Sequence, residues 1–204
     1  MNIITISREF GSGGRELGKR LADLLDYDYY DREIITAIAA QKELNEDYVE
    51  KVLENRTFQT IPLTFRRSFA SVNTMQQTQT NLLVAQKCVI EGIAKAGKNC
   101  VIVGRNADVL LADRRLFSIF VCAEMEAKIR RCLERADKRE NLSPREIENN
   151  IRHIDKSRAK TREMIAGCKW GECSTYHLTV NTTDWNIKEL APAVAEFALC
   201  WFRR

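Results

Sequence analysis

The chain has 204 residues, of which 45% are hydrophobic and 29% charged, and its formal net charge is +4. These values are typical of a globular protein with one well-buried α/β domain. No apolar run approaches the roughly 18 residues that a membrane-spanning helix needs. The mild positive charge is by itself no sign of nucleic-acid binding. Because the chain opens directly into an apolar stretch with no basic leader, we expect a cytoplasmic protein.

The first predicted elements surround a glycine-rich stretch. Residues 3–6 are apolar and β-branched and predict a short buried strand. Leucines recur at helical spacing over residues 15–25, which predicts a helix. Residues 27–30 predict a second strand, and the apolar positions of residues 32–54 predict one long helix.

The middle of the chain repeats the alternation of helix and strand. Residues 82–96 predict a helix that ends at Gly97. Residues 100–103 are apolar and β-branched and have the look of a central parallel strand. Residues 116–121 predict another strand, and residues 124–135 a helix. Residues 55–80 are polar and aromatic and hard to assign, and the runs at 65–69 and 75–80 fit a loop followed by the start of a helix.

The last third of the chain begins with a clear signal for the amino terminus of a helix. Ser143 is the N-cap, Pro144 takes the first position and Glu146 completes a capping box. This helix is expected to run to about residue 164. A strand at 177–181 and a helix at 187–202 follow. Strands that alternate with helices imply a parallel sheet covered on both faces.

Seven cysteines are spaced widely and irregularly. Only Cys168 and Cys173 are close, and neither a second pair nor a histidine cluster completes a zinc site. Cys100, Cys122 and Cys200 fall in apolar runs, where a free thiol behaves as a small hydrophobic side chain. We expect reduced, structural cysteines.

Gly11, Ser12, Gly13 and Gly14 lie between the first strand and the first helix. Glycines allow backbone torsions that turn successive N–H groups inward, and the helix amino terminus adds unpaired donors. The stretch therefore predicts a phosphate cradle, although a tight turn that needs glycine only for its geometry is the alternative.

The cradle departs from the Walker A pattern G-x-x-x-x-G-K-[ST]. With Gly13 as the second glycine, Gly14 stands at the lysine and Arg8 at the first glycine. With Gly14 as the second glycine, Arg15 replaces the lysine and Glu16 the hydroxyl residue. Arg15 is able to bind a phosphate, and Glu16 is a possible Mg²⁺ ligand.

Two further polar clusters follow later in the chain. The strand at 100–103 is followed by Arg105, Asn106 and Asp108, and the strand at 27–30 by Asp31. Ligands of parallel sheets bind beyond the carboxyl ends of the strands, so these residues are expected to face one crevice. The second cluster is rich in arginine, a residue type that kinases bring to the moving phosphoryl group. It comprises Arg130, Arg131, Arg135, Arg139, Arg152, Asp155, Arg158 and Arg162.

These clusters together resemble the cytidylate kinase-like branch of the bacterial cytidylate kinases, which are P-loop nucleoside monophosphate kinases. The resemblance rests on residues 6–16, 30–33 and 103–108. Residues 154–158 resemble the Asp-x-x-Arg of the cytidylate kinase lid, and residues 177–183 the final strand of the family. The similarity spans most of the chain, and residues 55–80 carry no matching motif.

The resemblance implies a three-layer α/β/α P-loop NTPase fold with a parallel five-stranded sheet. In a single domain, 32–97 would be a helical monophosphate-binding region and 130–165 an arginine-rich lid. The implied reaction is phosphoryl transfer from ATP, with Mg²⁺ bound through the phosphates, to CMP or dCMP.

The resemblance also implies roles for individual residues. Gly11 to Arg15, with Glu16, would hold the donor phosphates. The acceptor would meet Asp31, Arg105, Asp108 and Asn106, the last standing where the family has an aspartate. Arg135, Arg139, Asp155 and Arg158 would form the lid, where Asp155 and Arg158 would also help to bind the monophosphate. The catalytic residues would be Arg15, Arg135, Arg139 and Arg158.

Two rival functions remain open, together with the oligomeric state. The first is a kinase of the same fold for another small acceptor, and the second a nucleotide-binding regulatory protein without useful turnover. A nucleic-acid role is less expected, because glutamates are interspersed among the arginines. Monomer and homodimer both fit the sequence, and the C-terminal helix fits either the core or a dimer contact.

Overall fold

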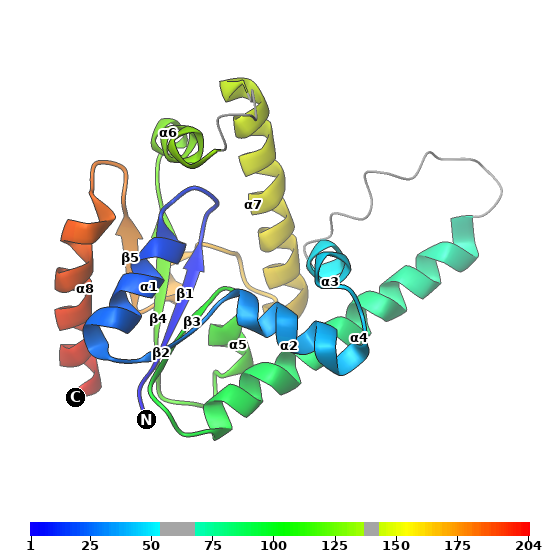
Figure 1. The fold of residues 1–204 in the computed structure, drawn as a ribbon, viewed down its shortest axis with the longest axis horizontal. Coiled ribbons are helices and arrows are strands. Elements are labelled where there is room, and N and C mark those ends of the chain that lie inside the picture. Colours follow the sequence, from blue (N-terminus) through cyan, green and yellow to red (C-terminus); the bar gives the residue numbers. More distant parts are fainter. Residues whose placement is uncertain (54–67, 137–142) are drawn as a thin grey trace.

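A five-stranded sheet forms the centre of the computed structural model, which describes residues 1–53, 68–136 and 143–204, without the side chains of residues 51 and 68–77 (Figure 1). All strands are parallel, in the order β2-β3-β1-β4-β5. Their bounds are β1 (Ile3–Arg8), β2 (Asp28–Tyr30), β3 (Cys100–Val103), β4 (Leu116–Cys122) and β5 (Leu178–Asn181). The carboxyl ends of all five strands therefore meet at one edge.

Helices cover both faces of the sheet and close over its carboxyl edge (Figure 1). One face packs against α1 (Gly14–Leu25) and α8 (Ile187–Phe202), and the other against α2, α3, α4 and α5. The bounds of this second group are Arg32–Lys42, Glu46–Leu53, Ser68–Lys95 and Ala107–Leu110. The helices α6 (Met125–Arg135) and α7 (Pro144–Ala166) stand beyond the carboxyl edge, and a short 3₁₀ helix covers Cys173–Thr175.

The core is split by the sheet into two apolar layers. On β1, Ile3 belongs to the layer under α2 and α4, whereas Ile4 and Ile6 belong to the layer under α1 and α8. Successive strand side chains point to opposite faces, so a strand that is buried on both sides needs apolar side chains toward both layers. The first strand supplies them with Ile3, Ile4 and Ile6, and its Thr5 and Ser7 are buried as well. The predicted three-layer parallel fold is confirmed.

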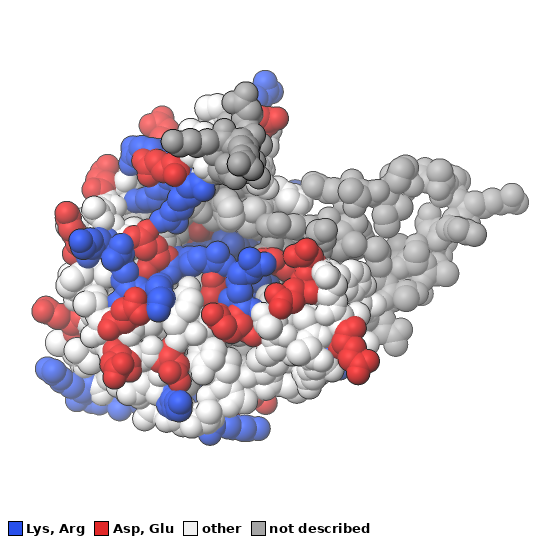
Figure 2. Space-filling view, viewed as in Figure 1, with Lys and Arg blue, Asp and Glu red and all other residues white. Residues whose placement is uncertain are grey.

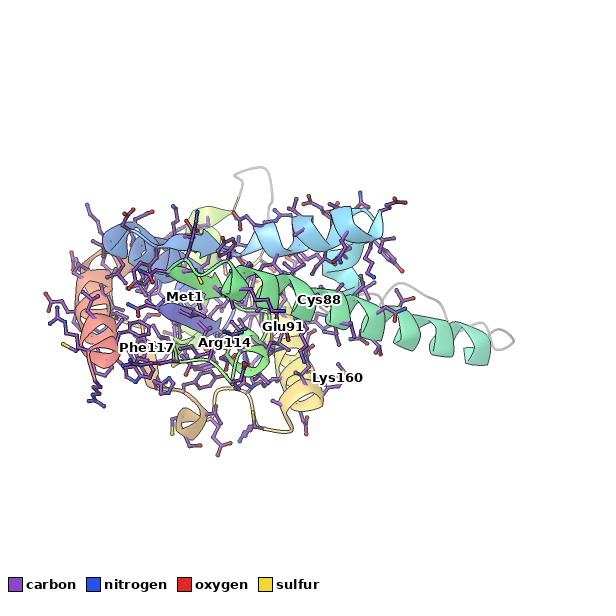
Figure 3. All side chains as sticks on the ribbon, turned by 90° about the horizontal axis from the view of Figure 1, so that it is seen from below. Met1, Cys88, Glu91, Arg114, Phe117 and Lys160 are labelled. Atoms are coloured by element: carbon purple, nitrogen blue, oxygen red, sulfur yellow. The ribbon has the colours of Figure 1, made fainter. Side chains whose placement is uncertain are left out.

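The C-terminal helix packs into the core. Phe117 of β4, labelled in Figure 3, has its ring centroid 5.7 Å from that of Phe197 and 5.5 Å from that of Trp201. Ile187 and Ala198 are buried in the same layer. The helix therefore closes one face of the sheet, as the core interpretation of its sequence predicts, although Phe197 remains 46% exposed.

Four predictions about local structure were wrong or incomplete. The predicted helix over residues 32–54 is two helices, because the chain turns into the left-handed region at Glu43 (φ 53°). The helix predicted to begin at residue 82 begins at Ser68, and α5 was not predicted. All seven cysteines are free thiols, but Cys200 is exposed rather than buried in an apolar run. Figure 3 shows Cys88, also exposed, on α4.

None of the helices in the described residues combines the length and the apolar character that a membrane crossing requires.

Candidate functional site

Residues 9–13 form a tight loop between β1 and α1. The Glu9 amide donates to the Val121 carbonyl at 2.9 Å, which ties the loop to β4. The buried Ser12 hydroxyl donates to the Glu9 carbonyl at 2.8 Å, and the Thr182 hydroxyl donates to the Ser12 carbonyl at 2.6 Å. Hydrogen bonds from three segments therefore hold the loop at the amino terminus of α1, where backbone N–H groups favour an anion.

Two glycines of this loop are required by the protein itself. Gly11 and Gly13 have φ values of 76° and 83°, which disfavour any residue with a Cβ. A Cβ on Gly11 would lie 3.0 Å from the Lys128 carbonyl oxygen, and one on Gly13 would lie 2.7 Å from the Ile187 side chain. Turn geometry and packing thus account for these glycines without any ligand, and the phosphate-binding role must rest on the surrounding charges.

Arg8, the last residue of β1, lies beside the loop, and the sequence pattern did not predict it as a site residue. Its side chain is only 14% exposed. A Cβ on Gly104 would lie 1.5 Å from the Arg8 Nη1 atom, and a Cβ on Gly14 would lie 2.5 Å from the Arg8 Cβ. The arginine therefore passes through room that two glycines leave open. The contact joins segments almost 100 residues apart, so no local pattern signals it.

Asp31, directly after β2, is the carboxylate at the centre of the site. Its side chain is 6% exposed and forms ion pairs with Arg8 at 3.5 Å and with Arg15. Burial, the main cause, and the nearby Arg158 lower the pKa of Arg8 to about 9, while Asp31 opposes this change. Arg105 and Arg15 lower it further. Positive charge is thus in excess around Arg8, because one carboxylate is shared between two guanidinium groups.

A buried lysine lies on the other side of the loop. Lys128 of α6 is 6% exposed, and its Nζ atom lies 3.0 Å from the Glu9 carboxylate and 3.3 Å from that of Asp155. Asp155 also accepts the Phe10 amide at 2.7 Å. Burial raises the pKa of Asp155, while the Phe10 amide and Lys128 oppose the rise. These side chains connect the loop to α6 and α7.

Arg158 of α7 reaches the end of β1. Its Nη1 atom donates to the Arg8 carbonyl at 3.0 Å, and its guanidinium carbon lies 5.8 Å from the centre of the Phe10 ring. Asp155 lies one turn earlier on α7, with its carboxylate 3.8 Å from Arg158. The predicted Asp-x-x-Arg pair is therefore assembled against the loop.

The loop after β3 brings Arg105 and Asn106 to the same edge. Both have left-handed torsions, with φ values of 58° and 53°, and follow Gly104 at 77°. A left-handed conformation costs a residue other than glycine about 1 kcal/mol. The buried Gln86 of α4 donates to the Arg105 carbonyl at 2.9 Å and holds this turn. The strain is offset by contacts that direct Arg105 toward Glu50, 4.0 Å away.

Two arginines of α6 approach the loop from the side of β5. Arg131 is buried and donates to the hydroxyl and the carbonyl of Thr182 and to the Trp185 carbonyl. Arg135 is half-exposed and forms an ion pair with Glu16. Arg131 therefore serves mainly to hold α6 against the end of β5, whereas Arg135 is free to exchange its partner at the surface.

These residues border two adjoining cavities at the carboxyl edge of the sheet. The larger, of about 460 Å³, lies beside the glycine-rich loop, and the smaller, of about 60 Å³, lies beside Gln86 and Trp170. Among its described lining residues the larger cavity has three carboxylates, Glu9, Asp31 and Glu50. It also has six arginines, namely Arg8, Arg15, Arg105, Arg131, Arg135 and Arg158. Figure 2 shows lysine and arginine side chains gathered across the middle of this face with acidic side chains between them.

Comparison with known proteins identifies the family of the chain. The cytidylate kinase-like family matches residues 3–184. The chain belongs to this family. Membership confirms the resemblance read from the sequence, and it supports a nucleotide or small-molecule kinase as the broad class of this protein. Among curated proteins, none matches the chain.

Solved structures agree on the fold of this family member. An uncharacterized protein from Eubacterium ventriosum is 21% identical, with a TM-score of 0.69, over 97% of this chain and 98% of that chain. Shikimate kinases from Acinetobacter baumannii and Bacteroides thetaiotaomicron are 14% and 15% identical, both with a TM-score of 0.56. The match covers 98% and 96% of this chain and 93% and 97% of theirs. At such identities the likeness shows the P-loop kinase fold alone.

The structure brings most of the predicted site residues together. Those that line the larger cavity are Gly11, Gly13, Gly14, Arg15, Asp31, Arg105, Arg135 and Arg158. Asn106 lines only the smaller cavity. Ser12 is fully buried within the loop, Glu16 pairs with Arg135, and Asp155 acts on the Phe10 amide. Arg139 lies outside the described residues.

Asp108 lies apart from the other predicted residues. Its carboxylate pairs with Arg162 at 2.5 Å, and both side chains are at most 8% exposed. Arg162 also lies over the Tyr176 ring at 5.3 Å. The two residues border neither of the two cavities at the loop, and their pairing joins α5 to α7.

The Glu16 and Ser12 side chains at the loop are both engaged within the protein. Both carboxylate oxygens of Glu16 are engaged, one by Arg20 at 2.9 Å and the other by Arg135. The Ser12 hydroxyl donates within the loop. In the part of the chain that the structure describes, no group of three His, Cys, Asp or Glu side chains is placed to hold a metal.

Proposed function

We propose that this cytidylate kinase-like chain transfers the γ-phosphoryl group of ATP to a nucleoside monophosphate, with CMP or dCMP as the acceptor. The observation that carries the proposal is the larger cavity beside the glycine-rich loop, which the described residues line with six arginines and three carboxylates. The excess of three positive charges among these residues suits the phosphates of a nucleotide. Phosphoryl transfer depends on such positioning and charge neutralisation more than on covalent chemistry.

The two cavities suggest how donor and acceptor are arranged. Gly11, Gly13, Gly14 and Arg15 border the larger cavity. With Ser12 they would hold the donor phosphates, and Mg²⁺ would be bound to phosphate oxygens. Arg8, Arg105 and Arg158 line both cavities and would surround the moving phosphoryl group at their junction. Residues 130–165 would act as the lid, and residues 32–97 as the acceptor-binding region.

A second candidate is a kinase for a smaller acceptor. The cavity beside Gln86 and Asn106 measures about 60 Å³, far below the roughly 300–1,000 Å³ of sites for drug-sized ligands. It accommodates a phosphate-sized group, whereas a nucleoside requires α3 or α4 to move outward. This observation favours a compact acceptor.

A coupled assay of ADP release separates the candidates. The purified chain is incubated with ATP or GTP and Mg²⁺ against CMP, dCMP, UMP, AMP and a panel of small hydroxylated acids and sugars. Turnover with CMP or dCMP well above the other acceptors supports the proposal. Turnover with a small acceptor alone supports the second candidate.

The same assay also identifies a regulatory protein. Nucleotide binding by calorimetry without turnover on any acceptor would refute both kinase functions and leave a nucleotide-binding regulator. Arg158→Gln should lower turnover by on the order of 10²–10³-fold, as removal of one transition-state donor does. Arg114→Gln, an exposed arginine paired with Asp113 and outside both the lid and the acceptor-binding region, is the control and should leave turnover unchanged.

A further inference from the structure

A nucleotide kinase with a Walker A loop uses the loop lysine to reach the β- and γ-phosphates. This chain has glycine or arginine at that position, depending on the register. In the register that starts at residue 8, Arg8 stands at the first glycine and Gly14 at the lysine. The structure places these two residues in contact, since a Cβ on Gly14 would lie 2.5 Å from the Arg8 Cβ.

We propose that the phosphate-binding cation of the loop has moved from position 14 to position 8, so that Arg8 does the work of the Walker lysine. The inference rests on the proposed function and names a binding residue within that site. Compared with a Walker A loop, the glycine and the cation have exchanged places between positions 8 and 14, which lie against each other in the structure. The guanidinium group then enters the site from β1 rather than from the start of α1.

The other cations near the loop fit this role less well. Lys128 is 6% exposed, is held between the carboxylates of Glu9 and Asp155, and does not border the larger cavity. The Arg15 side chain is 57% exposed, so water screens its charge. Arg8 is 14% exposed and lines both cavities.

The packing around Arg8 also favours a binding role. Gly104 and Gly14 leave room for the side chain, and Gly104 does so with a φ of 77°. Asp31 is the carboxylate that pairs with Arg8, at 3.5 Å, and it is shared with Arg15. Burial and three neighbouring arginines lower the pKa of Arg8 to about 9. An anion beside Arg8 would relieve this excess of positive charge.

Binding of inorganic tripolyphosphate, measured by titration calorimetry, tests the role of Arg8 without relying on catalysis. Arg8→Gln should weaken binding of tripolyphosphate and of ATP by at least about tenfold, since a charge-assisted contact is lost. Arg8→Lys should fall between Arg8→Gln and the wild type, because it keeps the charge but not the planar fork. Arg15→Gln should have a smaller effect than Arg8→Gln. The control Arg114→Gln, at an exposed arginine paired with Asp113, should bind as the wild type does.

A pair of variants tests the exchange of positions itself. Arg8→Gly alone should lose binding, and the double variant Arg8→Gly with Gly14→Lys should recover it at least in part, because the cation returns to the usual position. Circular dichroism and thermal melting establish which variants fold. If Arg8→Gln does not fold, tripolyphosphate binding by Arg8→Lys and by the double variant still tests whether the cation at position 8 binds phosphate.

The outcomes distinguish this inference from the proposed function. Wild-type binding of tripolyphosphate that survives in both Arg8→Gln and Arg8→Gly would overturn the role of Arg8 and leave the kinase proposal standing. Failure of the double variant to bind better than Arg8→Gly would likewise overturn the exchange. A wild-type chain that binds neither tripolyphosphate nor ATP would overturn the proposed function and this inference together.

Discussion

At the scale of single residues, the site depends on glycines that make room for an arginine. Gly104 and Gly97 have nearly the same left-handed torsion, with φ values of 77° and 76°. Their surroundings differ, because a Cβ on Gly97 would meet nothing within 4 Å, whereas one on Gly104 would meet the guanidinium group of Arg8. Substitutions at the two glycines therefore distinguish the cost of backbone strain from the cost of a collision with Arg8.

We expect Gly104→Ala to lower the free energy of unfolding more than Gly97→Ala. Each variant places alanine at a positive φ, which costs about 1 kcal/mol. Gly104→Ala must in addition displace Arg8, and an overpacked site costs about 1–3 kcal/mol more. Urea unfolding measures both variants. Equal losses would show that Arg8 does not occupy the room beside Gly104.

The same contact explains why the sequence predicted the cradle but not its central cation. Gly11 to Arg15 form a local pattern, and so do Arg105 and Asn106 after their strand. The fit of Arg8 against Gly104 appears only when β1 and β3 pair in parallel. Asp108 shows the converse, because a local pattern placed it in the site while a distant arginine takes it into a buried pair.

At the scale of elements, α7 carries two kinds of ion pair, and one of them joins it to another helix. The Asp108–Arg162 pair joins it to α5 at 2.5 Å and is almost fully buried. The Glu148–Arg152 pair lies along the helix itself at 2.7 Å, with side chains 36% and 64% exposed. The two pairs have similar distances but differ in burial. They should therefore differ greatly in how much the loss of one partner lowers the free energy of unfolding.

Removing one partner of the buried pair should destabilise the protein strongly. We expect Asp108→Leu or Arg162→Met to lower the free energy of unfolding by about 3–5 kcal/mol, because each leaves an unpaired buried charge. The double variant should lose less than the sum. The corresponding changes at Glu148 and Arg152 should each cost less than about 1 kcal/mol. If the stability losses of Asp108→Leu and Arg162→Met simply add in the double variant, the two residues do not pair directly. Urea unfolding measures the free energy of unfolding of each variant.

Element boundaries were predictable where capping residues mark them. Ser143, Pro144 and Glu146 marked the start of α7, and the structure shows both hydrogen bonds of the capping box. The break at Glu43 carries no glycine or proline signal, so apolar periodicity ran through it. The amino-terminal part of α4 is polar, and α5 has only four residues, so neither gives a helical pattern.

At the scale of the whole molecule, the amino end of the sheet is held by a histidine that lies away from the candidate site, with part of its ring packed on aromatic side chains although the residue is exposed. His177 lies just before β5, and its Nδ1 atom accepts the backbone N–H of Ser118 on β4 at 3.0 Å. Its ring stacks against Phe117 and contacts Trp201. Burial lowers the pKa of His177 below its ordinary value, so the folded protein favours the neutral ring.

This histidine should make stability depend on pH. Its pKa is lower in the folded chain than in the unfolded chain, where it is near 6.5. The unfolded chain therefore takes up the proton first, and stability that is complete above about pH 6.5 is lost as the pH falls below that value. His177→Asn keeps an acceptor for Ser118 but does not titrate.

The comparison is made by urea unfolding at pH 8 and at pH 5.5. We expect the wild type to lose more stability than His177→Asn between the two pH values. The difference in the free energy of unfolding between the two proteins at pH 8 reports only the change in packing and serves as the internal reference. Equal losses in the two proteins would show that His177 does not take up a proton preferentially on unfolding.

The contact between positions 8 and 14 restricts how such a loop is able to evolve. Lysine at position 14 would collide with the stem of Arg8, so such a change at position 14 requires a change at position 8 as well. Glycine at position 8 without that lysine would remove the cation at the end of β1 and leave the exposed Arg15 beside the loop. A search pattern that demands the Walker lysine does not find this chain, in which positions 8 and 14 hold arginine and glycine.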